Sequence, residues 1–268
     1  MKKKSLGIIG GGFVGSAIAN YYKNNGHEVK VYDKFKDSDP VEDVIQQDYI
    51  IIAVPTPHKE NMGIDLEAMD DAMANAAKAE KGKPVIIKST IIPGTTDKYQ
   101  KQYSDLRILF NPEFLTERTA VQDFQFPDRQ ILGFTKESYN IAGDILKFLP
   151  LAPFERIIPA IDAETVKYFN NTWFAVKVTF ANQFYDVCQK IGVDYNRVME
   201  CASADRRMTG TSHLKVDHDG YRGYGGKCLP KDVRAIIAYA DKLGVDMKLL
   251  KAAEEINKEL TGGVDKGL

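Results

Sequence analysis

Short hydrophobic runs alternate with amphipathic stretches along the first 160 residues of the chain. The hydrophobic runs predict buried strands over residues 6–9, 28–32, 49–54, 84–88, 107–110, 129–132 and 156–158. The stretches between them predict helices over residues 16–24, 66–79, 95–103 and from about 133 to 148. Because strands that alternate with helices build parallel sheets covered on both faces, we expect a doubly wound parallel sheet, an α/β domain over residues 1–160.

The pattern changes near Asp162, after which no strand is predicted. Apolar residues then recur every three or four positions, at Val166, Phe169, Trp173, Val176, Phe180, Phe184, Val187 and Ile191. This spacing predicts one helix of about 40 Å, capped by Asp162 and ended by Gly192. Further helices are expected over residues 196–202, 231–243 and 247–260, so residues 161–268 form an all-helical domain with one long central helix.

A second apolar stripe on the long helix, from Phe174 to Cys188, predicts that this helix is buried on two sides. Such a helix bridges two domains or forms the core of a homodimer, and burial within one domain is the alternative. We expect a homodimer built through this helix.

Composition and charge exclude several classes of protein. Thirty-six Lys and Arg against 37 Asp and Glu give a net charge of −1, which disfavours a generally basic nucleic-acid binder. No apolar run approaches the roughly 20 residues of a membrane span, and no signal peptide is recognisable. Three cysteines without a CxxC pair disfavour a disulfide framework and a cysteine-based zinc site. We therefore expect a cytoplasmic protein without a metal centre, a membrane segment or a nucleic-acid partner.

The segment from Gly10 to Gly15 fits the G-x-G-x-x-G pattern between a strand and a helix. Gly10 allows the tight turn, Gly12 lets the backbone approach a pyrophosphate, and Gly15 lets the helix pack close to the sheet. Asp33 ends the next strand, where a carboxylate binds ribose hydroxyls and repels a 2′-phosphate. This Rossmann-like fingerprint predicts NAD as cofactor, although Lys34 and Lys36 nearby weaken the preference over NADP. An ordinary glycine turn is the alternative.

The segment from Gly223 to Asp232 places Cys228 after three glycines and before Pro230, which suits the first turn of a helix. A thiol at a helix N-terminus beside Lys227 and Lys231 has more thiolate character, as a nucleophile requires. A small buried thiol in a turn is the alternative, and it suits Cys188 and Cys201 better.

Two further groups of polar residues are candidates for chemistry. Lys167 and Asn171 lie four residues apart and share one face of the long helix, where a cation and an amide donor stabilise an oxyanion. The segment from Asn111 to Glu117 follows a strand end, where α/β enzymes place active-site groups. Its carboxylates suit a general base or sugar hydroxyls, and solvated surface residues are the alternative in both cases.

Together these segments resemble the UDP-glucose/GDP-mannose dehydrogenase family. The matching segments are Gly10–Gly15 with Asp33, Val54–Pro57, Lys88–Thr90 with Pro93–Thr95, Asn111–Leu115, Ala163–Glu164 with Lys167, Tyr168 and Asn171, and Gly223–Asp232. The resemblance implies oxidation of the C6 hydroxymethyl of a nucleotide sugar, UDP-glucose by default, to a carboxylate with two NAD. It also implies a role in surface polysaccharide synthesis.

The resemblance further implies a role for each matching residue. Cys228 is the nucleophile that carries a thiohemiacetal and a thioester, Lys167 and Asn171 hold the oxygen anion, and Glu117, Asp232 and Thr90 manage protons and water. The residues implied to contact NAD are Gly10, Gly12, Phe13, Val14, Gly15, Asp33, Pro55, Thr56, Thr90, Glu113 and Lys231. Those implied to contact the sugar nucleotide are Glu113, Phe114, Leu115, Lys167, Asn171, Tyr224, Gly225 and, toward a partner subunit's substrate, Arg206.

The chain departs from the family in length and in two segments. It resembles a short form without the C-terminal nucleotide-binding domain of longer members. Asp219 to Arg222 replaces a Pro-Gly-Pro-like segment, and Asn182-Gln183 replaces Asn-Glu. Two other functions therefore stay open. One is a two-electron β-hydroxyacid dehydrogenase, which needs no thiol, and the other is a catalytically impaired NAD-binding subunit.

Overall fold

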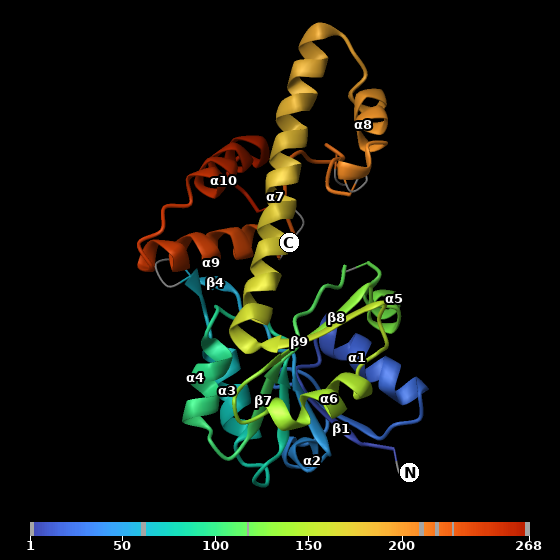
Figure 1. Cartoon of the computed structure of the whole chain (residues 1–268), viewed down its shortest axis with the longest axis vertical. Helices are drawn as coiled ribbons and strands as arrows, with labels where there is room; N and C mark the ends of the chain where they lie inside the picture. The colour runs from blue at the N-terminus through green and yellow to red at the C-terminus, as the bar shows by residue number, and fades with distance from the viewer. Residues whose placement is uncertain are drawn as a thin grey trace. The chain divides into compact units, whose positions relative to one another are not determined.

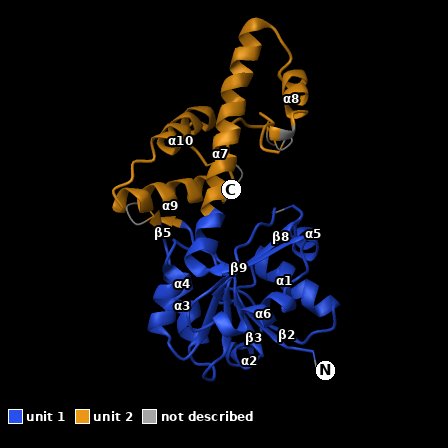
Figure 2. Ribbon diagram, viewed as in Figure 1, with its two compact units in different colours: residues 1–57, 64–167 blue, residues 58–63, 168–268 orange. Residues whose placement is uncertain are grey.

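The computed structural model describes residues 3–59, 63–116, 118–208, 212–217, 220–226 and 228–265. The chain divides into two compact units (Figures 1 and 2). Unit 1 contains residues 1–57 and 64–167, and unit 2 contains residues 58–63 and 168–268. The predicted boundary at residue 160 coincides with the start of the long helix, whereas the units divide seven residues further along it. The reason is that the first two turns of this helix pack into the core of unit 1, through Ala160 and Ala163.

Unit 1 is built on a seven-stranded sheet with the order β2-β1-β3-β6-β7-β8-β9. The strands are β1 (Leu6–Ile9), β2 (Val29–Tyr32), β3 (Tyr49–Ile52), β6 (Pro84–Ile87), β7 (Arg107–Phe110), β8 (Arg129–Phe134) and β9 (Phe154–Pro159). The first five pair in parallel, β8 pairs antiparallel to β7, and β9 is parallel to β8. The doubly wound sheet is thus mostly parallel, which confirms the predicted fold class, although the antiparallel pairing of β8 with β7 was not predicted.

Side chains of successive strand residues point to opposite faces of this sheet, and each face has its own core. In β3, Ile50 and Ile52 belong to one core and Ile51 to the other. Helices α2, α3, α4 and the start of α7 cover the first face, and α1, α5 and α6 cover the second (Figure 1). Because both faces are buried, the strands appear in the sequence as continuous runs of Ile, Leu and Val.

The helices of unit 1 include two short ones that the sequence pattern did not predict, α2 and α5. The helices are α1 (Phe13–Asn24), α2 (Val41–Ile45), α3 (Glu67–Ala76), α4 (Thr95–Gln102), α5 (Ala120–Gln125) and α6 (Tyr139–Phe148). A two-stranded hairpin of β4 (His58–Lys59) and β5 (Gly63–Ile64) was also not predicted. Elements of two to six residues carry too few apolar positions to show a period, so the pattern alone does not reveal them.

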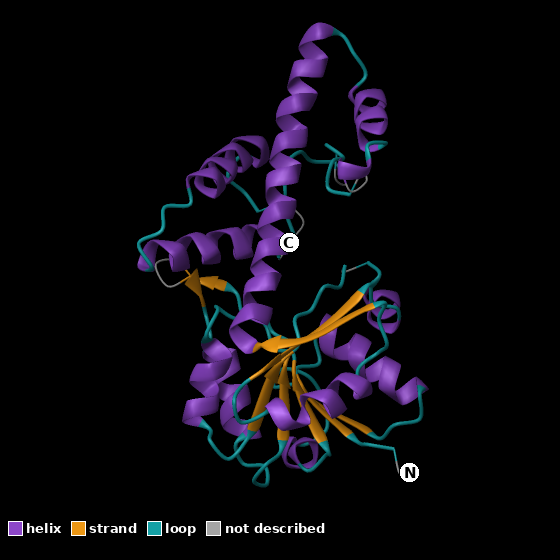
Figure 3. Cartoon of the chain, viewed as in Figure 1, coloured by secondary structure: helices purple, strands orange, loops and turns teal. Residues whose placement is uncertain are grey.

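In the described part of unit 2, the regular secondary structure is helical apart from this hairpin region, as Figure 3 shows. Its helices are α7 (Ala160–Ile191), which starts in unit 1, α8 (Tyr195–Ser203), the 3₁₀ turn η1 (Arg206–Met208), α9 (Leu229–Lys242) and α10 (Lys248–Thr261). Helix α7 ends at Gly192, which has a φ of +73°, as predicted. It begins two residues before Asp162, so Asp162 lies in its first turn and is not its cap, contrary to the prediction.

The two apolar stripes of α7 have different environments within the chain. Val178, Ala181 and Cys188 are buried inside unit 2. The other stripe is largely exposed, with Phe169 at 73% and Phe180 at 57% of their full accessibility. Its further exposed members are Trp173, Phe184, Val187 and Ile191. One face of α7 is therefore covered by this chain and the other is not.

Candidate functional site

The glycine-rich turn lies where the order of the strands reverses, between β1 and β3. Open α/β sheets bind ligands at this position, outside the carboxyl ends of the strands. Gly10 has a φ of +106°, and a Cβ there would lie 2.4 Å from the carbonyl oxygen of Ala53. A Cβ on Gly15 would lie 1.9 Å from the Gly10 oxygen. A Cβ on Gly12 would meet nothing within 4 Å, so this glycine faces the open space that a phosphate needs.

Asp33 is tied to the glycine turn. Its Oδ2 accepts a hydrogen bond of 2.8 Å from the Gly11 amide, and its Oδ1 accepts one of 3.0 Å from the Phe35 amide. Lys36 donates to the Gly11 carbonyl at 2.6 Å. Helix α1 begins at Phe13 without a side-chain cap, so its first amides are available to an anion. This set of groups fits NAD, with the pyrophosphate at the start of α1 and the adenosine ribose at Asp33.

The loops after β3 and β6 are joined to each other by hydroxyl groups. Thr56 donates its Oγ1 proton to the Thr90 carbonyl at 2.7 Å. Ser89 Oγ accepts from the Val54 amide at 2.9 Å and donates to the Val54 carbonyl at 2.8 Å. Pro55, between these residues, is exposed. Thr56, Thr90 and Pro55 therefore lie at the same sheet edge as the glycine turn, where a dinucleotide passes.

Glu113 and Lys167 form a buried pair at the end of β7. Lys167 is 5% exposed, and its Nζ donates to the Glu113 carbonyl at 2.6 Å and lies 3.4 Å from Oε2 of the same residue. The other carboxylate oxygen of Glu113 accepts the amide of Leu115. Phe114 packs beside this pair, with its ring 5.8 Å from the Lys167 ammonium. The loop after β7 thus holds the Lys167 side chain of α7. The sequence motif alone did not indicate this contact.

Two buried groups of unit 1 were quoted within motifs but were assigned no role. Burial lowers the pKa of the Lys88 ammonium to about 8, and the Glu113 carboxylate partly opposes this shift. Lys88 donates to Asn111 Oδ1 at 2.6 Å, and Asn111 Nδ2 donates to the Ile131 carbonyl at 2.8 Å. Lys88 therefore fixes the residue that begins the loop of Glu113. The signal in the sequence that could have identified Lys88 is the position of a lysine at the end of an apolar strand.

Glu164 is the second of these groups. It is fully buried on α7, and burial raises the pKa of its carboxyl to about 7 against the opposing effect of its hydrogen bonds. It accepts hydrogen bonds from the Gly94 amide at 2.5 Å, the Thr96 amide at 2.8 Å and the Thr96 hydroxyl at 2.6 Å. These donors lie at the start of α4, so Glu164 joins that helix to α7 within unit 1.

Unit 2 presents Cys228 at the start of α9. Cys228 is exposed and occupies the N-cap position, with Pro230 in the first turn. Asp232, one turn further, is 1% exposed and donates its amide to the Cys228 carbonyl at 2.9 Å. Its carboxylate accepts from Asn171 Nδ2 at 2.5 Å and from Lys231 Nζ at 2.6 Å. Unit 2 thereby brings Asn171 of α7 together with the first turn of α9.

The remaining predicted residues differ in how the structure places them. Tyr224 is 2% exposed, and its side chain points into unit 2, where its hydroxyl donates to Glu254 at 2.8 Å. Gly225 is partly exposed. Arg206 begins η1, but its side chain is outside the described part of the chain, and Glu117 lies wholly outside it.

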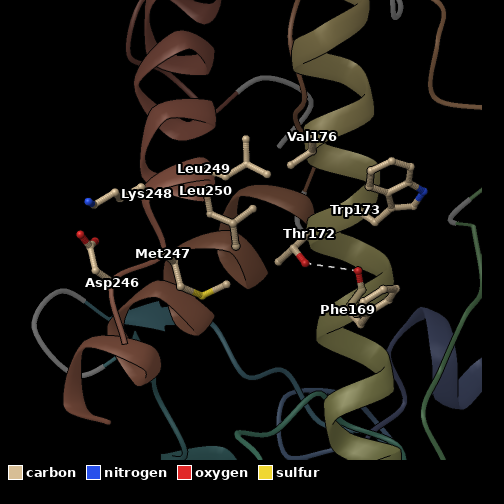
Figure 4. A pocket seen from close by; sticks show the side chains of 9 residues that line it. All are labelled: Phe169, Thr172, Trp173, Val176, Asp246, Met247, Lys248, Leu249 and Leu250. Carbon is tan, nitrogen blue, oxygen red and sulfur yellow. Dashed lines mark hydrogen bonds between the residues drawn. The ribbon is translucent and has the colours of Figure 1, made fainter. Parts of the chain in front are cut away.

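An apolar groove of about 450 Å³ lies in unit 2 between α7 and the start of α10 (Figure 4). Its lining includes Phe169, Trp173 and Val176 of the exposed stripe on α7, with Met247 and Leu249 opposite. Among the described residues that line it there is none of the candidate catalytic side chains. The groove therefore extends the exposed face of α7, and its described lining is separate from the candidate catalytic residues.

Among the described helices, none combines the length and hydropathy of a membrane span. In the same part of the chain, no three His, Cys, Asp or Glu side chains are grouped so that they could hold a metal ion.

The fold and the glycine turn are typical of a dinucleotide-binding protein, and comparison with known proteins specifies the family. The family model for the UDP-glucose/GDP-mannose dehydrogenase NAD-binding domain matches residues 35–147, and the model for the central domain matches residues 161–259. The chain belongs to the UDP-glucose/GDP-mannose dehydrogenase family, and its cofactor is NAD.

Three relatives illustrate the extent of the match. UDP-glucose 6-dehydrogenase AglM of Haloferax volcanii is 32% identical over 94% of this chain and 69% of its own length. GDP-mannose 6-dehydrogenase of Pseudomonas syringae is also 32% identical, over 82% of this chain and 52% of its own length. The crystallised UDP-glucose dehydrogenase of Pyrobaculum islandicum superposes with a TM-score of 0.85 at 27% identity, covering 96% of this chain and 68% of its own. The chain thus spans about half to two thirds of these relatives.

Proposed function

We propose that this protein oxidises the C6 hydroxymethyl group of a nucleotide sugar to a carboxylate, with Cys228 as the nucleophile. The observation that carries the proposal is the first turn of α9, where an exposed thiol precedes a buried Asp232 bonded to Asn171. A two-electron β-hydroxyacid dehydrogenase has no use for this thiol. UDP-glucose is the first substrate to test, because the AglM relative, which aligns with most of this chain, carries that name.

NAD accepts one hydride in each of two oxidations when it is bound. In the first, the C6 hydroxyl loses a proton and C6 loses a hydride, which gives an aldehyde. The Cys228 thiolate adds to the aldehyde carbon and forms a thiohemiacetal, which loses a second hydride to give a thioester. Water then attacks the thioester carbon and the C–S bond breaks. One hydroxymethyl group, two NAD⁺ and one water give one carboxylate, two NADH and three protons.

Lys167 and Asn171 are proposed to stabilise the oxygen anion of these steps. Both are buried, and they lie one turn apart on α7. Lys167 contributes a positive charge, and Asn171 contributes amide protons in a water-poor setting, where such donors act most strongly. Glu113 holds the Lys167 ammonium in place through two oxygen atoms, so the cation is ordered before the substrate arrives.

Asp232 is proposed to bind the hydrolytic water or the proton that it releases. Its carboxylate is already held by Asn171 and Lys231, which fixes its orientation. Thr90 and Glu117 are proposed to act with it, as the resemblance implies. For the substrate we propose contacts with Phe114 and Leu115, with the Gly225 backbone, and with Arg206 from a partner subunit. Tyr224 contributes only through its backbone, because its side chain is committed to Glu254.

We also propose that the protein is a homodimer through α7. Six large apolar side chains are exposed along one face of this helix, and the groove of Figure 4 continues that face. A soluble monomer rarely leaves an apolar patch of this extent open to water. A two-fold pairing would cover the same patch on both copies.

The test is to incubate the purified protein with excess NAD and a limiting amount of UDP-glucose, GDP-mannose or a UDP-N-acetylhexosamine, and to count NADH per sugar consumed. Two NADH and one carboxylate per sugar support the proposal and identify the substrate. One NADH per sugar with an aldehyde product would contradict it. NAD binding measured by calorimetry without turnover on any of these sugars would favour a binding subunit instead.

A further inference from the structure

Gly223 lies against helix α10 at van der Waals distance. It has a φ of +91°, and a Cβ at this position would lie 2.5 Å from Asn257 Oδ1 and 3.2 Å from Thr261 Cγ2. A side chain is therefore excluded by the left-handed backbone and by the contact itself. The glycine is needed here to bring the backbone before Cys228 onto α10.

Tyr224, the next residue, is held at three atoms by two residues of α10. Its amide donates to Asn257 Oδ1 at 2.7 Å, and its carbonyl accepts from Asn257 Nδ2 at 3.0 Å. Its hydroxyl donates to Glu254 Oε2 at 2.8 Å. Asn257 is 3% exposed, so its amide group serves the backbone of one residue as a neighbouring β-strand would.

Glu254 is itself fixed. Its other oxygen accepts from Arg234 Nε on α9 at 2.6 Å, and the Arg234 guanidinium also binds both oxygens of Asp265, at 2.9 and 2.7 Å. Burial of Tyr224, together with the Glu254 carboxylate, raises the pKa of the Tyr224 phenol, so the hydroxyl remains a donor. This network joins α9, α10 and Asp265, and it includes none of the side chains that we assign to the chemistry.

We propose that Asn257, assisted by Glu254, is a positioning residue for Cys228. Tyr224 precedes Cys228 by four residues, and Cys228 begins α9, whose Arg234 belongs to the same network. Both ends of the segment that carries the thiol are therefore attached to α10. The thiol needs a fixed place at the helix N-terminus, because the amides there stabilise the thiolate. The inference rests on the proposed role of Cys228 as nucleophile.

The experiment uses the three cysteines of the full chain as reporters. The rate of iodoacetamide labelling of each cysteine at pH 7 is measured by peptide mass spectrometry in Asn257→Ala and Tyr224→Phe. The control is Lys258→Ala, because the Lys258 side chain is exposed and follows Asn257 in the sequence. Cys201 is exposed and serves as the internal standard, and Cys188 is buried and reports unfolding. We expect Asn257→Ala to lower the ratio of the Cys228 rate to the Cys201 rate at least threefold, and Tyr224→Phe about twofold, with Cys188 unlabelled.

Hydrogen exchange and kinetics complete the test. In Asn257→Ala the peptide that contains Tyr224 should exchange faster, and kcat should fall at least tenfold while KM for NAD is unchanged. A labelling ratio equal to that of Lys258→Ala in both variants would overturn the inference. If Asn257→Ala labels Cys188 and is therefore unfolded, Tyr224→Phe decides alone. If the two variants lower the labelling ratio but the wild-type protein oxidises none of the sugars, the proposed function is contradicted and the positioning of Cys228 is still supported.

Discussion

Lys167 and Asn171 are one helical turn apart on α7, yet they are held in different ways. Lys167 belongs to unit 1, where the carboxylate and the carbonyl of Glu113 bind its ammonium. Asn171 belongs to unit 2, where it binds Asp232, which also accepts the Lys231 ammonium. Each side chain faces a buried carboxylate, but only Lys167 carries a charge of its own.

From this difference we propose different roles for the two residues in the reaction. In the proposed mechanism, the Lys167 ammonium stabilises an oxygen anion, and Glu113 holds this ammonium in place. Asn171 has no charge, and its amide donates to Asp232, so we propose that it orients Asp232 as well as contacting the substrate. Removing the Lys167 ammonium should therefore raise the activation barrier of the oxidation. Altering Asn171 should affect both this activation barrier and the stability of unit 2. Substitutions at Cys228, Lys167 and Asn171 test this distinction, and Cys228, which the proposed mechanism requires as the nucleophile, comes first.

Cys228→Ser should abolish the complete oxidation, because a serine hydroxyl is a far weaker nucleophile toward the aldehyde at neutral pH. NAD binding should be unchanged, since its fingerprint lies in unit 1. The acid formed is measured by chromatography, and NAD affinity by calorimetry. Cys201→Ser, which alters an exposed thiol on α8, is the matched control. Undiminished acid from the Cys228 variant would remove the thiol from the mechanism.

Lys167→Met should lower kcat about 100- to 1000-fold, the usual loss for one oxyanion donor. The methionine preserves most of the side-chain volume but leaves Glu113 without its cation. Steady-state kinetics with the sugar and NAD varied in turn provide the measurement, and a fall in kcat with little change in KM for NAD is expected. Lys177→Met, at another buried lysine of α7, is the control. Equal losses in both variants would mean that the Lys167 effect is structural.

Asn171→Asp should destabilise unit 2, because it places a second carboxylate against Asp232. The expected loss in the free energy of unfolding is about 2 kcal/mol. The double variant Asn171→Asp with Asp232→Asn restores one amide and one carboxylate at the same positions. Urea unfolding should show recovery of stability in the double variant, and kcat should remain low because the carboxylate has moved. Full recovery of kcat would deny Asp232 a specific role.

Lys88→Met should change how stability depends on pH. Burial lowers the pKa of Lys88 to about 8 in the folded chain, from 10.5 in the unfolded chain. Between these values the unfolded state binds more protons, so this group makes the wild type more stable as pH rises from 8 to 10.5. At about 1.4 kcal/mol per pKa unit, the gain is up to about 3 kcal/mol. Urea unfolding at pH 7.5 and 10 should show it in the wild type and not in Lys88→Met.

Phe180→Glu should convert a homodimer into monomers with little effect on folding, because Phe180 is exposed within the chain. Light scattering coupled to size-exclusion chromatography measures the mass. Leu151→Glu, which places the same charge at an exposed leucine of unit 1, should leave the mass unchanged. A wild-type chain that is monomeric at every concentration would contradict the dimer.

The sequence predicted unit 1 better than unit 2 because buried strands and the glycine turn are local signals. Gly10 has a positive φ, and Gly15 packs against the Gly10 carbonyl, so both glycines follow from the turn itself. The direction of β8 was not predicted, since an apolar run does not reveal which way a strand pairs. Contacts between distant segments were also missed, among them Lys88 with Asn111 and Tyr224 with Asn257. A buried lysine or asparagine has no periodic signature, and its partner is known only from the fold.

Cys228 is proposed to carry the sugar during the second oxidation. The most direct measurement is to mix the protein with NAD and the active nucleotide sugar, quench in acid within one turnover, and determine the mass of the peptide that contains Cys228. We expect an acyl adduct of the nucleotide sugar on Cys228 and none on Cys201, with two NADH formed per adduct. Turnover to the acid with an unmodified Cys228 peptide at every quench time, or an adduct on another residue, would contradict it.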